Sequence, residues 1–354
     1  MARVHEVDGV KSCREEAAAI REGALLCPDD AIRVRANKGA DRLESLAASE
    51  ERKRKANEGG VLVLAEDATN QTVSRERSRQ AVRRGRDVYL PLRREGAVLL
   101  PNILLRSALF SANNNAGEEL VNEPIASLGQ KNELTFTGPR LGCYDRRVLA
   151  ACLQYYGAGV PLCPEGGEGQ WIKVTFWELA RSIRCSYGTT VHIAIRNSLK
   201  RLHKAQLRAR FDGWGIPQLR LLEVAFDDGE DGLENSTRSP KGSDVVAFRI
   251  GASMAKLFGL NVWTAVNLSV AHDYSGLASW LANFYSTHAK PYTLTLSYLY
   301  ELCGVVCSLP EFKRRLKNAL TRLQKDDVPD GCRVGCFELD NESLTVTLVR
   351  WGSK

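Results

Sequence analysis

The most informative segment of this 354-residue chain runs from Thr189 to Ala205 and reads T-T-V-H-I-A-I-R-N-S-L-K-R-L-H-K-A. Its apolar residues recur at steps of four, four and three, which is the spacing of one face of an α-helix. We predict a helix with an inward stripe of Val191, Ile195, Leu199 and Leu202. The rest of its surface is polar and basic, and no acid occurs between Arg181 and Arg210.

The residues around this helix predict its partners. W-I-K-V-T-F at 171–176 alternates as a strand, and W-E-L-A-R-S-I at 177–183 is a helix that Thr175 would cap. An earlier helix covers 144–156. After the basic helix, L-R-A-R-F and I-P-Q-L-R-L-L-E-V-A-F are predicted to pair as a hairpin around D-G-W-G. Three helices followed by a two-stranded wing are typical of a winged helix-turn-helix.

The same order of elements is predicted a second time. It begins with a helix at 275–288, followed by the strand P-Y-T-L-T-L and the helix S-Y-L-Y-E-L-C-G. The next helix runs from Pro310 to Gln324, where Ser308 and Glu311 have capping-box spacing. A hairpin then pairs C-R-V-G-C-F-E-L with L-T-V-T-L-V-R-W across D-N-E-S.

The predicted fold class is therefore α+β, with two tandem winged-helix domains at 100–250 and 251–354. Residues 1–99 contain one aromatic side chain, Tyr89, and several charge runs, so we expect a flexible, charged N-terminal arm. All six Trp, all ten Phe and nine of the ten Tyr lie after this arm.

Charge is concentrated in blocks. The net charge is +7, but Arg181–Arg210 holds eight Lys or Arg residues, and Lys313–Lys325 holds six without an acid. Arg75–Arg94 holds eight arginines, whereas Glu223–Asp244 is acidic. Separate basic blocks favour a polyanionic partner, and nucleic acid is the expected one.

The outward faces of the two basic helices are the candidate DNA-binding sites. Long basic side chains reach phosphates, and a bidentate Arg or Asn reads base edges, so Arg196 and Asn197 are the predicted base readers. Ile193 would suit a thymine methyl group. The full candidate set is Thr189, Thr190, Ile193, Arg196, Asn197, Lys200, Arg201, Lys204, Arg314, Arg315, Lys317, Asn318, Thr321 and Arg322. His192 and His203 are expected at the surface without a special role.

The sequence offers little for catalysis, and we expect no enzyme and no cofactor. It has no G-x-x-x-x-G-K-[ST] motif, and no histidine pair has H-x-H or H-E-x-x-H spacing. The C-x-x-x-C pairs Cys303/Cys307 and Cys332/Cys336 leave zinc open as an alternative to small buried core residues. No window approaches the roughly 18 apolar residues of a membrane span, and the N-terminus has no apolar signal core, so a soluble, unexported protein is expected. Together with the basic blocks, this predicts a cytoplasmic, DNA-associated protein.

Several segments resemble the plasmid replication initiators of the TrfA family. These are R-S-A-L-F at 106–110, E-L-T-F-T-G from Glu133, T-F-W-E-L-A at 175–180, the basic helix after Gly188, and F-Y-S-T-H-A-K-P-Y-T-L-T-L with Y-E-L-C-G. The resemblance covers about 250 residues in order. It implies two winged-helix domains, binding to direct repeats (iterons) in double-stranded origin DNA, origin opening, and recruitment of the host replicative helicase and initiator proteins. It also implies active monomers and inactive or repressive dimers, and hence a role in plasmid copy control.

Family members also carry a short peptide that binds the sliding clamp. The corresponding stretch here, R-G-R-D-V-Y-L-P-L, lacks the glutamine and the terminal phenylalanine of that peptide. Tyr89, Leu90 and Leu92 are the apolar residues available for a clamp contact, and an ordinary linker is the alternative. Two other functions stay open: a winged-helix transcriptional repressor, which would be autoregulatory, and a nicking relaxase.

Overall fold

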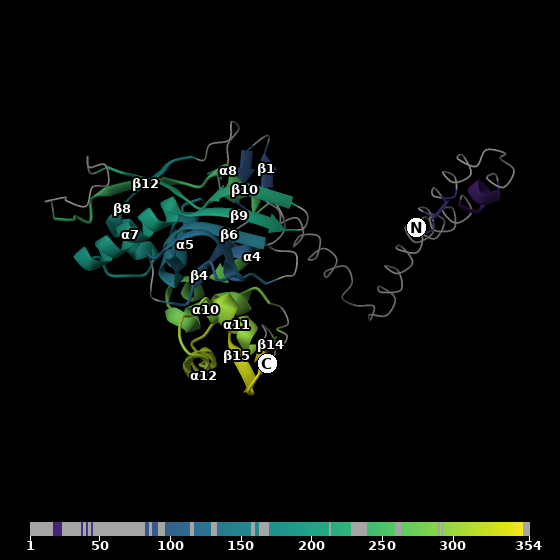
Figure 1. Ribbon diagram of the computed structural model, residues 1–354. Coiled ribbons are helices and arrows are strands. Elements are labelled where there is room, and N and C mark those ends of the chain that lie inside the picture. Colours follow the sequence, from purple (N-terminus) through teal and green to yellow (C-terminus); the bar gives the residue numbers. More distant parts are fainter. Residues whose placement is uncertain are drawn as a thin grey trace, which may run out of the picture. The chain divides into compact units, whose positions relative to one another are not determined.

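The computed structural model of the chain (Figure 1) divides it into two units, residues 1–74 and residues 75–354, which are described separately. The structure describes residues 17–22, 37, 40, 41, 44, 82–84, 87–90, 96–113, 117–128, 133–156, 160–162, 170–211, 214–227, 239–258, 263–288, 291 and 293–349. In the first unit, residues 17–22 are helical, and Arg21 forms ion pairs of 2.7 Å with both Asp41 and Glu44.

The second unit contains a first set of three helices and a three-stranded sheet. The strands pair in the order β11–β12–β8, so the last strand along the chain lies in the middle. The helices α5, α6 and α7 pack against one another. The set comprises α5 (Cys143–Gln154), β8 (Ile172–Thr175), α6 (Phe176–Ser182), α7 (Thr189–Lys204), β11 (Glu223–Phe226) and β12 (Val245–Arg249).

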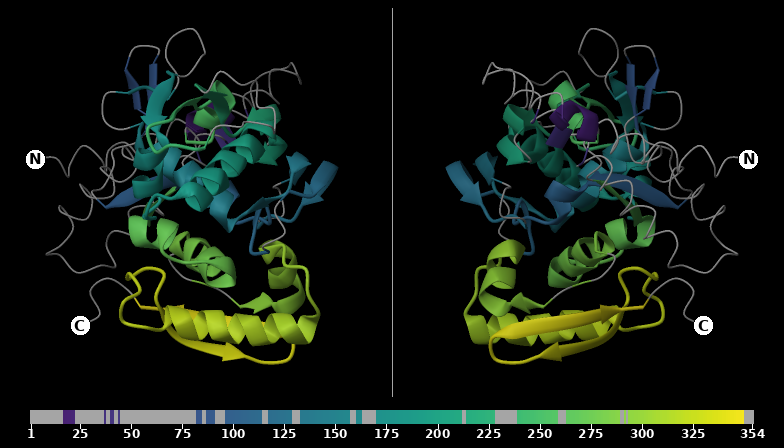
Figure 2. Two further views of the ribbon diagram at one scale, coloured as in Figure 1. Left: turned by 90° about the vertical axis from the view of Figure 1, so that its left-hand side faces the viewer. Right: turned by 90° about the vertical axis from the view of Figure 1, so that its right-hand side faces the viewer.

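A second set repeats this order and this sheet topology, in the lower part of Figure 1. Its strands pair as β15–β16–β14, again with the last strand in the middle. In Figure 2 the hairpin of this set runs along the long helix α12. The set comprises α10 (Gly276–Ser286), β14 (Leu294–Thr295), α11 (Leu296–Cys303), α12 (Leu309–Leu323), β15 (Val334–Leu339) and β16 (Ser343–Leu348). The predicted repeat of elements is therefore present in the structure.

The hairpin predicted after α7 is present, but its second strand is shorter than predicted. The segment I-P-Q-L-R-L-L-E-V-A-F, predicted as one strand, is two strands that belong to different sheets. β10 (Trp214–Arg220) pairs with β9 (Gln206–Phe211), and these two join β6 (Glu133–Pro139) and β5 (Glu119–Ile125) in a four-stranded sheet. The break falls at Leu221 and Leu222, which are both fully buried and therefore give no polar signal of a strand end. The first set thus carries β9–β10 as an inserted hairpin, and its own hairpin is β11–β12.

The folded body begins slightly earlier than predicted. β3 (Ala97–Pro101) is buried along its whole length and pairs antiparallel with β13 (Trp263–Asn267). Residues 97–99, assigned to the arm by composition, therefore lie in the core. The remaining short elements are β1 (Val82–Arg84), β2 (Asp87–Tyr89), α4 (Asn102–Leu105), β4 (Phe110–Ser111), β7 (Leu141–Gly142), α8 (Ala252–Lys256) and α9 (Leu268–His272). The domain boundary predicted at residue 250 falls between β12 and α8.

Local capping explains where the helices begin. Thr175 accepts a hydrogen bond from the amide of Glu178, whose carboxylate accepts one from the Thr175 amide, so the predicted cap of α6 is confirmed. Thr295 caps α11 with a single hydrogen bond, which its hydroxyl accepts from the amide of Tyr298. The capping box predicted at Ser308 does not form, because the Glu311 carboxylate turns instead to two arginines.

One hydrophobic core joins the two sets of elements. Trp280 stacks on Phe284 with ring centroids 4.8 Å apart and donates a hydrogen bond to the backbone oxygen of Ser107. The Arg146 side chain is 2% exposed and reaches from α5 to Ser279 of α10, where its Nη2 lies 2.7 Å from the hydroxyl oxygen. Since the two sets share this interior, the position of each basic helix depends on both.

Candidate nucleic-acid interface

Helix α7 follows the predicted amphipathic pattern. Ile195, Leu199 and Leu202 are fully buried, and Val191 is half-buried against the core. The helix begins after Gly188, whose backbone is extended, and no acid lies in its first turn. Its basic residues gather in the last turn, where positive charge is favourable beside the carbonyl end of a helix.

Most of the predicted DNA contacts on α7 are accessible. Thr189, Thr190, Ile193, Asn197 and Lys204 are exposed, whereas Arg196 and Lys200 are half-buried. Ile193 keeps 47% of its surface exposed, which is unusual for an isoleucine in a folded protein. These residues form one solvent-facing surface of the helix.

Arg196 lies at the edge of this surface. Its guanidinium carbon is 4.5 Å from the centre of the Phe226 ring, which belongs to β11. A second such contact occurs at the start of α6, where Arg181 lies 4.8 Å over the ring of the exposed Trp177. Both distances are within the range of a cation–π contact between a guanidinium and an aromatic ring.

Arg201 has a structural role that was not predicted from the sequence. Its Nη2 lies 2.7 Å from Oδ1 of Asp145, a carboxylate that is completely buried at the start of α5. The same carboxylate accepts hydrogen bonds from the Ser198 hydroxyl and the Gly142 amide. The Arg201 guanidinium is therefore turned into the protein, and any DNA contact by it stays a prediction.

The prediction that His192 lies at the surface is wrong. His192 is 2% exposed and stacks on Phe176 with ring centroids 3.8 Å apart. Its Nδ1 is 3.1 Å from the Tyr187 hydroxyl. His192 stands three residues before Ile195 and seven before Leu199, so it belongs to the buried face of the helix. The prediction missed this because only apolar residues were counted in the stripe. His203 is exposed, and its Nδ1 accepts a hydrogen bond from the Val224 amide.

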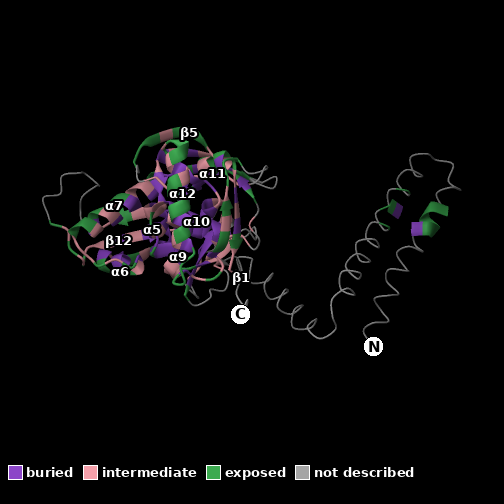
Figure 3. Cartoon of the chain, turned by 90° about the horizontal axis from the view of Figure 1, so that it is seen from below, coloured by how far each residue is buried: buried purple, intermediate pink, exposed green. Residues whose placement is uncertain are grey.

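Helix α12 presents the second basic face. Phe312, Leu316, Ala319, Leu320 and Leu323 are buried, as predicted. Figure 3 shows α12 on the side turned to the viewer, with exposed residues along it. Among the predicted DNA contacts, those exposed are Arg314, Arg315, Lys317, Asn318 and Thr321, and Arg322 is half-buried.

Carboxylates organise the arginines of α12. Glu311 Oε1 accepts hydrogen bonds of 2.7 Å from both Arg314 and Arg315, and these bonds lower the pKa of Glu311 to about 2. Arg322 makes two hydrogen bonds to Asp327, at 2.9 and 2.7 Å, and its guanidinium carbon lies 5.1 Å from the centre of the Tyr274 ring. The arginines are thereby held in place without being buried.

A cavity of about 370 Å³ lies beside the α12 face. It separates α12 from the start of α10, and three arginines with one asparagine supply its polar lining. The lining residues are Ala112, Gly276, Leu277, Ala278, Val305, Arg314, Arg315, Asn318, Ala319 and Arg322.

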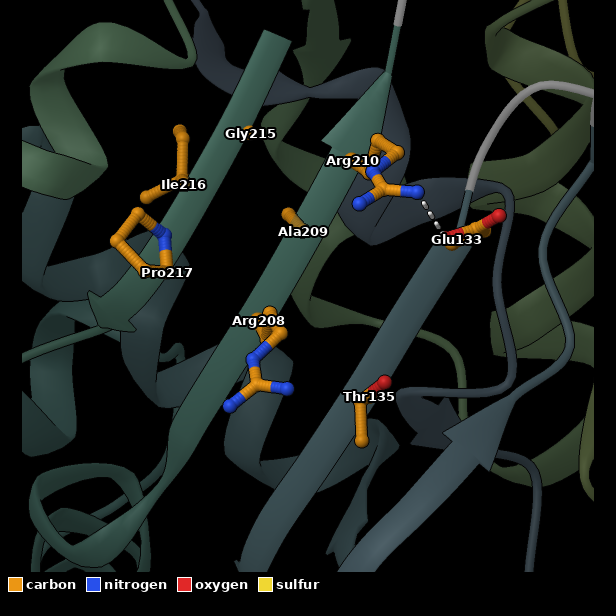
Figure 4. Close-up of a pocket in the computed structure, with 8 residues that line it drawn as sticks. All are labelled: Glu133, Thr135, Arg208, Ala209, Arg210, Gly215, Ile216 and Pro217. Atoms are coloured by element: carbon orange, nitrogen blue, oxygen red, sulfur yellow. Dashed lines mark ion pairs between the residues drawn. The ribbon is translucent and has the colours of Figure 1, made fainter.

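The four-stranded sheet carries a further basic surface, which was not predicted from the sequence (Figure 4). A hollow of about 270 Å³ there is lined by Arg208, Arg210, Glu133, Thr135, Ala209, Gly215, Ile216 and Pro217. Arg208 and Arg210 project from the same side of β9, and Arg210 lies 3.4 Å from Glu133. The alternation L-R-A-R at 207–210, with Leu207 and Ala209 buried, is the signal that could have indicated this face.

The candidate clamp-binding residues are only partly placed. Tyr89, at the end of β2, and Leu90 are half-buried, and Leu92 lies outside the described residues. The contact with a clamp stays a prediction.

The cysteines were predicted mostly as small core residues. Cys303 and Cys332 are buried, and burial raises the pKa of both thiols, while Cys336 is exposed. No group of three or more His, Cys, Asp or Glu side chains that could hold a metal ion occurs among the residues the structure describes. Within the same residues, no helix is both long and apolar enough to cross a membrane.

The fold and this surface define a mixed α/β protein with small sheets, in which a repeated set of elements presents two basic helices. The resemblance to TrfA-type initiators is confirmed as a distant homology. The chain is 24% identical to the plasmid replication initiator protein TrfA of Escherichia coli over 207 residues, which are 58% of this chain and 50% of that relative. The chain thus matches half the length of TrfA.

Among solved structures, the crystal structure of domains 2 and 3 of RctB matches with a TM-score of 0.46 and 12% identity, over 71% of this chain and 98% of that one. A second RctB structure of the same domains matches with a TM-score of 0.43 and 12% identity, over 64% and 85% of the two chains. No family model matches the sequence.

Proposed function

We propose that this protein is a plasmid replication initiator that binds double-stranded origin DNA through α7 and α12. One observation carries the proposal: the fold places a basic, solvent-facing helix at the same point of two repeated sets of elements. A single cationic helix is often only a solvated face, whereas two in equivalent places suit neighbouring major grooves of one duplex. The homology to TrfA supports replication as the process.

We infer that each set is a winged helix. On this basis α6 and α7, or α11 and α12, are the helix-turn-helix pair, and β11–β12 or β15–β16 is the wing. The sheet order supports it, because in both sets the first strand pairs with the last. The inserted hairpin β9–β10 would then be an addition to the first winged helix.

The proposed function includes what the initiator resemblance implies. The DNA sites are direct repeats, the partners are the host replicative helicase and initiator proteins, and active monomers are in balance with dimers. Binding and assembly, without catalysis by this chain, are the proposed means of opening the origin.

A binding titration against tiled duplex fragments of the source replicon tests the proposal. The matched variant carries Lys200→Ala and Lys204→Ala, which removes two cations from the α7 face. We expect tight binding confined to a fragment with direct repeats.

In the variant, the slope of log K against log salt should be less steep by about 0.9 for each phosphate that is no longer neutralised. Tight binding to a repeat-free promoter fragment would instead support the transcriptional repressor. Uniform weak binding to all fragments would contradict both functions.

A further inference from the structure

The two basic helices can be aligned residue by residue through their buried faces. Four buried positions of α7 match four buried positions of α12 when the sequences are aligned without a gap. The matched pairs are Ile195 with Leu316, Ser198 with Ala319, Leu199 with Leu320, and Leu202 with Leu323. Because side chains on one helical face recur in a fixed pattern, this alignment also matches the outward positions.

Three positions outside the buried set then carry the same residue, two of them within both helices and the third two residues after the end of α12. The pairs are Asn197 with Asn318, Arg201 with Arg322, and Lys204 with Lys325. The other outward positions differ, for example Ile193 with Arg314 and Lys200 with Thr321. The identical residues are candidates for a role that both helices have in common, and the residues that differ are candidates for contacts made by one helix alone.

Both matched arginines form ion pairs with carboxylates of the protein. Arg201 is paired with the buried Asp145, and Arg322 makes two hydrogen bonds to Asp327. Their side chains keep only 20% and 37% of their surface exposed. A guanidinium held in this way orients its helix, and it has fewer free donors for a base edge.

The matched asparagines, unlike the matched arginines, leave their polar groups available to a ligand. Asn197 and Asn318 are both exposed in the middle of their helices, and neither carboxamide makes a hydrogen bond to any other residue that the structure describes. Asn318 also lines the arginine-rich cavity beside α12. A free carboxamide offers one acceptor and two donors, which match N6 and N7 of adenine in the major groove.

We propose that Asn197 and Asn318 are equivalent specificity-determining residues, each reading one adenine in its own half of the binding site. This inference rests on the proposed function and adds which base is read and by which residues. It also assigns the other matched residues: Arg201 and Arg322 position the helices, while Lys204 and Lys325 contact phosphates. The two halves of each site should therefore share an adenine at corresponding positions.

Selection of binding sites from a randomised duplex library, followed by sequencing, tests the inference. The variants are Asn197→Ala, Asn318→Ala and the amide-retaining Asn197→Gln, in the full chain. We expect the wild-type protein to enrich a motif with two adenines, and each alanine variant to lose preference at one of them by about ten- to a hundredfold. Asn197→Gln should retain part of the preference for adenine, because glutamine carries the same amide.

Lys204→Ala and Lys325→Ala are the matched controls. Both should weaken binding to every sequence and reduce the salt slope, while the enriched motif stays the same. If Asn197→Ala and Asn318→Ala enrich the wild-type motif unchanged, the assignment is overturned while the initiator function stands. If the wild-type protein enriches no motif at all, the proposed function fails, and this inference fails with it.

Discussion

The carboxylate of Asp145 is completely buried, and its Oδ1 lies 2.7 Å from Nη2 of Arg201. Asp145 stands in the first turn of α5 and Arg201 in the last turn of α7, so the ion pair fixes the end of one helix against the start of another. The Ser198 hydroxyl and the Gly142 amide complete the surroundings of the carboxylate. The direction in which α7 presents its basic face therefore depends on a buried polar contact as well as on apolar packing.

Asp145→Ala should lower the free energy of unfolding by about 3–5 kcal/mol, because it leaves the partly buried Arg201 guanidinium without its counter-charge. Urea unfolding followed by circular dichroism measures this change. Arg210→Ala is the control, since its ion pair with Glu133 is about 70% exposed on both sides and should contribute at most about 1 kcal/mol. Equal losses in the two variants would show that the buried pair contributes no more than the exposed one.

Thr175→Ala and Thr295→Ala should each destabilise the protein by about 1 kcal/mol, because each removes a side-chain cap from the start of a helix. Ser308→Ala at the start of α12 should have almost no effect, since its hydroxyl makes no capping hydrogen bond. Thermal unfolding of the three variants side by side checks the prediction. A loss for Ser308→Ala as large as for the two threonine variants would contradict this difference between the caps.

Acid should weaken the fold through His272. Burial, with the charges of Arg147 and Arg184, lowers the pKa of His272 to about 4 from 6.5. Between these values the unfolded chain binds a proton that the folded chain does not, so stability falls as the pH is lowered from 6.5 towards 4, by up to about 3 kcal/mol. His272→Leu should remove this part of the pH dependence. Unfolding free energies at several pH values, compared between variant and wild type, measure it, and parallel curves would assign the acid sensitivity to other groups.

Gly304→Ala should be costly because Gly304 ends α11 with a φ of +59° and a Cβ there would lie 2.9 Å from the Ser111 Cβ. The left-handed backbone alone costs roughly 1–2 kcal/mol for alanine, and the clash adds to this. Gly331 has a φ of +93° with open space around it, so Gly331→Ala isolates the backbone cost. Unfolding midpoints in urea should separate the two variants, and equal midpoints would mean that the contact with Ser111 relaxes freely.

The helices and their starting residues could be predicted well from the sequence. Both basic helices have long amphipathic patterns, and Thr175 stands three residues before Glu178, so local spacing contains the needed information. The hairpin β9–β10 was predicted, but the end of β10 and the separate strand β11 were missed, because the apolar run at Leu221 and Leu222 continues through the strand break. Which sheet a strand joins is decided by distant pairing, and no local pattern records it.

For the candidate site, the sequence predicted which residues point outward, but not which of them contact other parts of the protein. Arg201 and Arg196 have the same chemistry and neighbouring positions, yet one is held by a buried carboxylate 56 residues earlier and the other lies on a phenylalanine ring. The partners come from α5 and β11, and helical periodicity does not report on other elements. His192 was misplaced for a different reason: it lies on the buried face by helical spacing but was not counted with the apolar residues.

The pairing of β3 with β13 has a consequence for how the protein is made. β3 is a fully buried run of apolar residues, and its partner strand ends only at Asn267, so the two strands are separated by the whole of the first set of elements. On the ribosome, where chains grow at about 5–20 residues per second, synthesis from the end of β3 to the end of β13 takes roughly ten to thirty seconds. During that interval the elements from α5 to β12 can fold, while the apolar strand β3 has no partner strand to pair with. We therefore expect the growing chain to be prone to aggregation during this interval, and lower temperature or available chaperones should improve the yield of folded protein.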